Sequence, residues 1–244
     1  MKEGKRLGKV FIDTNIINYA IGFRDADIFA WIKEIYETIY IHQSVLDELV
    51  VNKHIAQKYI DQKDWLLFNP TGDLTPEEFG VYSLHVGRVT TGFVNLDEKK
   101  KKDGRPIKNT TNIGEIDSLA GALYLSANLI CSNDFDIKEV IDDERLTVNI
   151  TTDDDFQEVD EEDIDLDIDL DEELTEADLA EADTSLQQLI VQDTLEDLCC
   201  YSVAMGLATK KLVRTFFKVS HPNDKKDKLA QKLARLNQRL AELP

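Results

Sequence analysis

The chain has 244 residues, enough for one or two domains with a substantial hydrophobic core. Its net charge of −20 would disfavour nucleic-acid binding if it were evenly spread, but it is not. Residues 1–150 carry a net charge of −6, residues 151–184 hold 18 acids and no base, and residues 185–244 carry +4. The acidity therefore belongs mainly to one segment, and averaging it over the chain would mislead.

Cysteine usage and apolar runs exclude two further classes of protein. Cys131, Cys199 and Cys200 form neither a disulfide framework nor a CxxC metal motif. No apolar run approaches the roughly 18 residues that a membrane-spanning helix needs, and the charged N-terminus precedes no signal-peptide core. We therefore expect a soluble, reduced, cytoplasmic protein with no membrane partner.

Strands and helices are predicted to alternate up to residue 150. Apolar and β-branched runs predict strands at 10–12, 38–42, 65–68, 129–132 and 146–150. Helical patterns lie between them, at 25–37, at 44–62, from Thr75 onward, at 114–128 and at 137–141. This alternation predicts an α/β fold, a three-layer α/β/α sandwich with a largely parallel sheet.

The segment 90–112 interrupts this alternation. It is polar and holds four consecutive lysines at 99–102 beside Asp103 and Gly104, so a loop is expected. A solvated loop is the plainer interpretation of the lysines. The alternative is a phosphate contact beside a site, which would make ligand binding depend on salt.

Beyond residue 150 the pattern changes twice. Residues 151–184 carry dense negative charge that resists compaction, so a disordered acidic linker is predicted. Helical patterns return over 184–219, and a heptad-like stripe follows, formed by Leu229, Leu233, Leu236, Leu240 and Leu243. The expected organisation is an α/β domain at 1–150, the linker at 151–184 and a helical extension at 185–244.

Four acids are expected to meet at one edge of the sheet. Asp13 and Asp134 follow predicted strands directly, and Glu48 lies in the helix after the second strand. Asp117 lies near the start of the helix at 114–128. Sites of parallel sheets gather where the strands end. Crowded carboxylates raise each other's pKa unless a cation lies between them, and an all-oxygen set suits Mg²⁺ or Mn²⁺ rather than zinc.

Four segments resemble, in order, the acidic motifs of PIN-domain ribonucleases. They are residues 11–15 (FIDTN), 44–49 (SVLDEL), 114–120 (GEIDSLA) and 129–136 (LICSNDFD). The resemblance covers residues 8–150. It implies a Mg²⁺- or Mn²⁺-dependent endoribonuclease that hydrolyses RNA, of the kind found as toxins in bacterial toxin–antitoxin pairs.

The resemblance also implies roles for individual residues. The metal-coordinating, catalytic acids of the family are matched by Asp13, Glu48, Asp117 and Asp134, and the supporting polar positions by Thr14, Asn15 and Ser132. Two further acids, Glu115 and Asp136, either assist the metal ligands or merely carry charge at a helix start. Water would be the nucleophile, oriented by Glu48, with two ions bracketing the phosphodiester.

Residues 151–244 have no counterpart in the family pattern, which leaves alternatives open. One is a catalytically silent PIN-fold scaffold whose C-terminal helices dock a protein partner. Another is inhibition in cis by 151–244, set against the plainer interpretation of a flexible tether. A homodimer also stays open. The sequence does not specify which RNA is cut or whether DNA is accepted.

Overall fold

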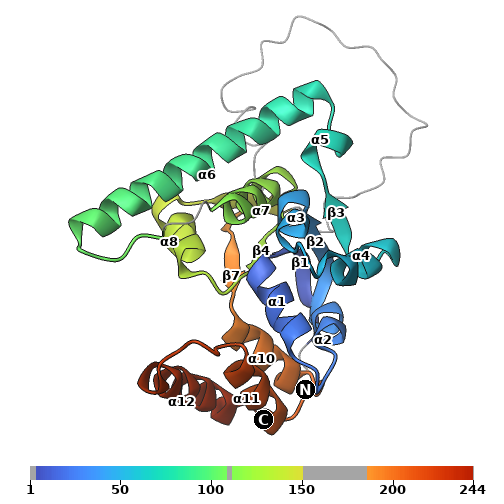
Figure 1. The fold of residues 1–244 in the computed structure, drawn as a ribbon. Coiled ribbons are helices and arrows are strands. Elements are labelled where there is room, and N and C mark those ends of the chain that lie inside the picture. Colours follow the sequence, from blue (N-terminus) through green and yellow to red (C-terminus); the bar gives the residue numbers. More distant parts are fainter. Residues whose placement is uncertain (1–3, 109–111, 151–185, 244) are drawn as a thin grey trace, which may run out of the picture.

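The structure, a computed structural model, describes residues 4–108, 112–150 and 186–243 (Figure 1). The segment 151–184, predicted to be a disordered linker, lies outside the described residues. Helices cover both faces of a parallel sheet, so the fold is the α/β/α sandwich that the alternating pattern predicts. In the described part of the chain, no helix combines the length and the apolar composition needed to cross a membrane.

Within the described residues, five parallel strands form the central sheet, in the order β3-β2-β1-β4-β7. Ile12 pairs with Cys131, and Cys131 pairs with Asp193, so neighbouring strands end level with one another. Asp13 directly follows the central strand at that edge. The bounds are β1 Arg6–Ile12, β2 Tyr36–His42, β3 Leu66–Phe68, β4 Leu129–Cys131 and β7 Val191–Asp193.

Alternate residues of β1 face two separate hydrophobic clusters, as the period of a strand requires. Val10 and Ile12 pack with the first helical layer, and Phe11 packs with the second. The first layer comprises α1 Thr14–Gly22, α2 Ile28–Ile35, α10 Leu195–Ala204, α11 Lys210–Val219 and α12 Lys226–Glu242. The second comprises α6 Pro76–Lys102, α7 Ile113–Tyr124 and α8 Phe135–Glu144.

The single helix predicted over 44–62 is wrong, because the chain forms two helices there. These are α3 Gln43–Glu48 and α4 Lys53–Asp61, and a short α5 Pro70–Asp73 follows β3. The turn between α3 and α4 leaves Val50 and Val51 exposed. The first helix therefore ends at Glu48, which places that carboxylate at a helix end near the carboxyl edge of the sheet.

The loop predicted over 90–112 is wrong over residues 90–102, which continue α6, whereas residues 103–108 are irregular as predicted. The side chain of Thr75 caps this helix in a reciprocal pair with Glu78. Further along, buried Val89, Phe93 and Leu96 pack in the second hydrophobic cluster. The lysines lie in the last helical turn, where positive charge is favourable.

Part of the predicted helical extension belongs to the sheets. Two strands, β6 Leu186–Leu189 and β7, replace the helix expected over 186–193. The predicted last strand of the main sheet, β5 Thr147–Ile150, pairs instead antiparallel with β6 in a separate two-stranded sheet. The fifth place in the main sheet is taken by β7, beside β4.

The C-terminal helices share the core of the first layer. The ring of Phe216 on α11 lies 5.2 Å from that of Phe23 and 6.0 Å from that of Trp31. Leu236 and Leu240 of α12 are fully buried in the same cluster. The leucine stripe therefore packs, at these two positions, within the chain itself.

Candidate functional site at the carboxyl edge of the sheet

Asp13 is held tightly at the end of β1. The residue is 2% exposed, and its Oδ1 accepts a hydrogen bond from the backbone N–H of Thr14 at 2.8 Å. Oδ2 accepts from the hydroxyl of Ser132 at 2.7 Å and from the side-chain amide of Asn15. These donors come from the N-terminus of α1 and from the residue after β4. Adjacent strand ends thus fix one acid in one orientation.

The surroundings of Asp13 disfavour its charge. Burial raises the pKa of this carboxyl to about 6, against the hydrogen bonds from Ser132 and Thr14, and the charges of Glu115 and Glu48 raise it further. The negative charge is therefore incompletely compensated by the protein. A bound cation would offset the remainder.

Glu48 connects the α3 end to the same site. Its Oε2 accepts a hydrogen bond from the hydroxyl of Thr14 at 2.6 Å. The carboxylate also lies against Gly114 in the first turn of α7, where a Cβ would come within 2.7 Å of Oε1. A side chain at Gly114 would displace the carboxylate. The glycine therefore lets Glu48 approach the helix that carries Glu115 and Asp117.

Both acids of α7 have raised pKa values. Burial is the main cause for Glu115, and the charges of Glu48 and Asp136 add to it against that of Lys108. Burial also raises the pKa of Asp117, and Glu48 adds to it. The charge of Glu48 thus raises the pKa of three acids, Asp13, Glu115 and Asp117. This acid cluster consists of Asp13, Glu48, Glu115 and Asp117.

Asp117 also faces a second group of polar residues. Its Oδ2 lies 3.8 Å from Nδ1 of His42, whose Nε2 is 3.1 Å from the hydroxyl of Tyr82. Burial lowers the pKa of His42 to about 4, so the ring is neutral near pH 7. Because Nδ1 accepts from the backbone N–H of Ser44, the ring proton is assigned to Nε2, which donates to Tyr82. Sequence reasoning missed His42, because nothing in its spacing indicates this contact.

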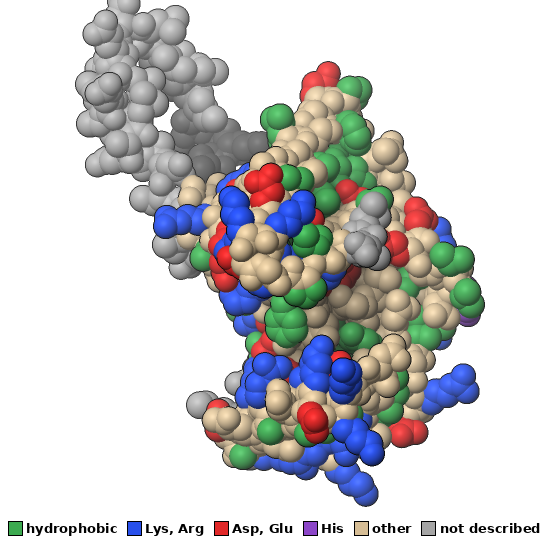
Figure 2. Space-filling model, turned by 60° about the vertical axis from the view of Figure 1, so that its left-hand side comes forward, with side chains coloured by type: hydrophobic (Ala, Val, Ile, Leu, Met, Phe, Trp, Pro, Cys, Tyr) green, Lys and Arg blue, Asp and Glu red, His purple; other side chains and the backbone are tan. Residues whose placement is uncertain are grey.

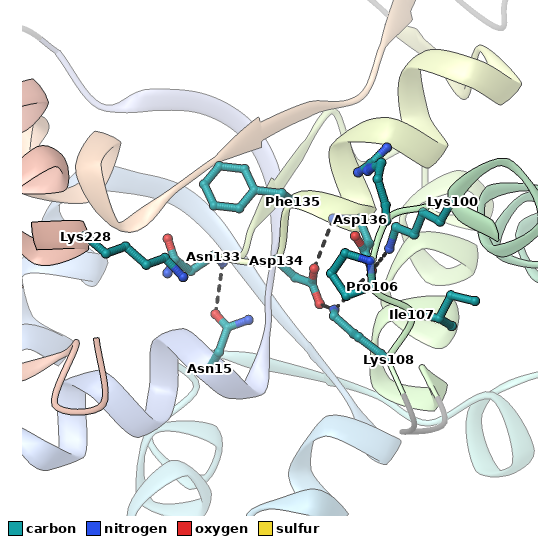
Figure 3. Close-up of a pocket in the computed structure, with 11 residues that line it drawn as sticks. Asn15, Lys100, Pro106, Ile107, Lys108, Asn133, Asp134, Phe135, Asp136 and Lys228 are labelled. Atoms are coloured by element: carbon teal, nitrogen blue, oxygen red, sulfur yellow. Dashed lines mark hydrogen bonds and ion pairs between the residues drawn. The ribbon is translucent and has the colours of Figure 1, made fainter. Parts of the chain in front are cut away.

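Asp134 and Asp136 are neutralised by lysines (Figure 3). Asp134 caps α8 by accepting from the backbone N–H of Asp136 at 3.0 Å, and it forms an ion pair with Lys108. Asp136 pairs with Nζ of Lys100 at 2.7 Å and of Lys108 at 3.4 Å. Burial works to raise the pKa of Asp136, but these two ammonium groups outweigh it and the pKa lies below its ordinary value. Lys100 and Lys108 therefore already supply positive charge to these two acids.

One hydroxyl links the two groups of acids. Ser132 donates to Asp13 and accepts from the backbone N–H of Asp134 at 3.1 Å. Asn15 bridges the same two strand ends, since its Oδ1 accepts from the backbone N–H of Asn133 at 3.0 Å. Asn15 and Ser132 therefore connect the ends of β1 and β4 at this edge of the sheet.

The loop after β4 is also held by a residue that sequence reasoning missed. Gln192 of β7 donates its side-chain amide to the carbonyls of Ser132 and Asp134, at 2.7 and 2.8 Å. No sequence signal could have found it, because Gln192 lies beyond the acidic segment in a three-residue strand. Lys100 belongs to the lysine run for which a phosphate contact beside a site was one alternative, and here it pairs with Asp136.

The donor set fits a hard divalent cation in its chemistry. The acid cluster offers only carboxylate oxygens, and three of its four members have raised pKa values. Among residues 4–108, 112–150 and 186–243, no three His, Cys, Asp or Glu side chains form a ready-made metal site. Side chains of the cluster would therefore have to turn toward one another to share an ion.

Comparisons of the chain with protein-family models, with curated proteins and with solved structures found no match. The PIN-domain assignment therefore stays a prediction that rests on the four sequence segments.

Proposed function

We propose that this protein is a Mg²⁺- or Mn²⁺-dependent endoribonuclease of PIN type, with water as the nucleophile. The observation that supports it is the acid cluster, in which three carboxylates with raised pKa values surround Glu48 near the carboxyl edge of the sheet. Such a cluster costs free energy unless a cation binds, and it lies where sites of parallel sheets are found. The proposed enzyme would act in the cytoplasm. A toxin of a toxin–antitoxin pair is one role that it could have there.

The chain's own residues have distinct parts in this proposal. Asp13, fixed by Ser132, Thr14 and Asn15, would hold the cation in one place. Glu48, positioned by the hydroxyl of Thr14, would orient the attacking water. A bound divalent ion would lower the pKa of water and stabilise the leaving oxygen.

The first prediction concerns Asp13→Asn, which keeps the shape of the side chain but removes its charge. Cleavage of a labelled RNA in Mn²⁺ should fall by more than about 100-fold, since even partners of metal ligands cost 10–100-fold when lost. Mn²⁺ binding by calorimetry should weaken in parallel. The matched control is Asp142→Asn, an exposed acid of α8 paired with Lys138. Undiminished cleavage by Asp13→Asn ends the assignment.

The silent scaffold is the second candidate function. It is favoured by the ion pairs of Asp134 and Asp136 with lysines, which leave these two acids less need of a metal. Against its proposed docking role, Leu236 and Leu240 of α12 are buried within the chain. Absence of Mn²⁺ binding by the wild-type protein would select the scaffold. A homodimer stays a prediction under either function.

A further inference from the structure

A continuous groove runs from the acid-bearing edge of the sheet to α12. It consists of three adjoining cavities of about 540, 410 and 300 Å³. All three are lined by Phe135, the first residue of α8. Lys228 of α12 lines the first two, and Asn133 lines the first and third. We refer to these joined cavities as the α8–α12 groove.

The groove is rich in basic side chains although the chain as a whole is strongly acidic. Among the described residues, eight Lys or Arg residues line it, against four Asp or Glu residues. Three further acids, Glu139, Asp142 and Asp224, pair with lining cations from just outside it. Figure 2 shows Lys and Arg side chains gathered above and below a recess on this face. In a chain of net charge −20, this local excess marks a surface suited to an anion.

Three of the cations follow one face of α12. Lys228, Lys232 and Arg235 are spaced four and three residues apart, which places them on the same side of the helix. Asp224 pairs with Lys232 at 2.7 Å and with Lys228 at 3.5 Å, and Glu196 pairs with Arg235 at 3.2 Å. Even so, the side chains of Lys228 and Arg235 are 65% and 59% exposed. They remain open to a further anion.

An aromatic ring lies in the middle of this basic surface. Phe135 is 54% exposed, and its ring projects from the start of α8 into the space that Lys228 approaches from the other side (Figure 3). An exposed aromatic ring between rows of cations is the arrangement on which single-stranded nucleic acids stack their bases. A purely acidic peptide has no flat ring that could stack on Phe135.

The groove also opens onto the site. Asn15, which donates to Asp13, lines the same cavity as Phe135 and Lys108. A strand lying in the groove would therefore bring its backbone to the edge where Asp13 lies.

We propose that the α8–α12 groove binds single-stranded RNA, with Phe135 stacking on an unpaired base and Lys228 and Arg235 contacting phosphates. The choice of RNA as the nucleic acid rests on the proposed function. The preference for a single strand rests on the ring, because a base inside a duplex is not available for stacking.

The test measures binding of the full-length protein in EDTA, where no divalent ion supports cleavage. The probe is a labelled oligouridylate of about 12 nucleotides, followed by fluorescence anisotropy. Phe135→Ala should weaken binding about fivefold or more. Lys228→Ala/Arg235→Ala should lower the slope of log affinity against log salt by about 1.4, since each phosphate contact on a single strand contributes about 0.7.

A matched control keeps the net charge change the same. Lys218→Ala/Lys226→Ala removes two exposed lysines that do not line the groove. Lys226 precedes Lys228 by two residues, so it lies about 200° around the helix. This control should bind with wild-type affinity and slope. Circular dichroism of each variant shows that its fold is retained.

Several outcomes would overturn the groove proposal. These are equal binding by both double variants, equal affinity for a duplex of the same length, or a Phe135→Ala variant that binds as wild type. Equal binding of a polyglutamate peptide would point to a general polyanion surface and would also overturn it.

The groove proposal and the nuclease proposal can be contradicted independently of each other. Groove-dependent binding without any cleavage in Mn²⁺ contradicts the nuclease alone. Asp13-dependent cleavage that the groove variants leave unchanged contradicts the groove alone.

Discussion

At the scale of single residues, the main feature of the site is the free-energy cost of burying the charged form of Asp13. Three donors hold its oxygens, yet burial still raises its pKa to about 6. The strand that Asp13 follows could be predicted, because Val10, Phe11 and Ile12 form an unbroken apolar run. The orientation of Glu48 could not, since it depends on where α3 ends and on the space left at Gly114.

A pH dependence of stability follows from the raised pKa of Asp13. The unfolded carboxyl loses its proton near pH 4, whereas the folded one keeps it to about 6. In this window the folded state binds more protons, so the free energy of unfolding falls as pH rises, by about 3 kcal/mol at most. Urea unfolding of wild type and of Asp13→Asn at about pH 4 and pH 7.5 measures this.

The variant should gain stability relative to wild type at the higher pH, because its amide does not ionise. Mn²⁺ should restore part of the wild-type loss at pH 7.5 and leave the variant unchanged. A difference between the two proteins that is the same at both pH values would contradict the raised pKa.

At the scale of elements, α6 and β7 show where sequence patterns stop being sufficient. The last turns of α6 carry four lysines, and they are held by contacts with α8, namely Lys99 with Asp143 at 2.6 Å and Lys100 with Asp136 at 2.7 Å. No local pattern reveals such partners. The strand β7 has three residues, and its place beside β4 depends on the backbone of Asn128 and Ser132. Longer periodic segments, such as α7, were predicted close to their observed bounds.

The buried ion pair of α6 leads to a prediction at this scale. Lys100 is 4% exposed, so Lys100→Ala leaves Asp136 with Lys108 as its remaining lysine partner among the described residues. Breaking a buried pair costs about 3–5 kcal/mol, and Lys108 should reduce the loss to about 2 kcal/mol or more. Urea unfolding checks this against Lys101→Ala, an exposed lysine one residue on. Equal stability of the two variants would show that the pair does not hold α6 to α8.

At the scale of the whole molecule, the chain completes its sheet only after the acidic segment. The strand β7 follows that segment, and the helices after it bury Phe216, Leu236 and Leu240 in the core shared with α1 and α2. A polar, highly charged segment is predicted from sequence as a boundary between units. Here the chain on its far side returns to the same sheet, which composition alone does not reveal because long-range pairing leaves no local signal.

This arrangement predicts that one deletion prevents folding and that another preserves it. Removing 151–244 takes away β7 and large apolar side chains worth about 1.5–3 kcal/mol each when buried, against a typical stability of 5–15 kcal/mol. This truncated chain should fail to fold. Replacing only 151–185 by an Asn-Gly turn should preserve the fold, because Ile150 and Leu186 are directly paired across β5 and β6. Thermal unfolding of both chains checks the difference.

The shortened chain is therefore the proper test of inhibition in cis. It removes 18 acids and no base while the sheet, the acid cluster and the α8–α12 groove remain. If the segment competes with RNA as a polyanion, the shortened chain should bind single-stranded RNA more tightly and cleave it faster than the full chain. An unchanged rate excludes that inhibition and leaves the segment as a tether. If the shortened chain unfolds, the prediction that a short turn between β5 and β6 can replace residues 151–185 is wrong.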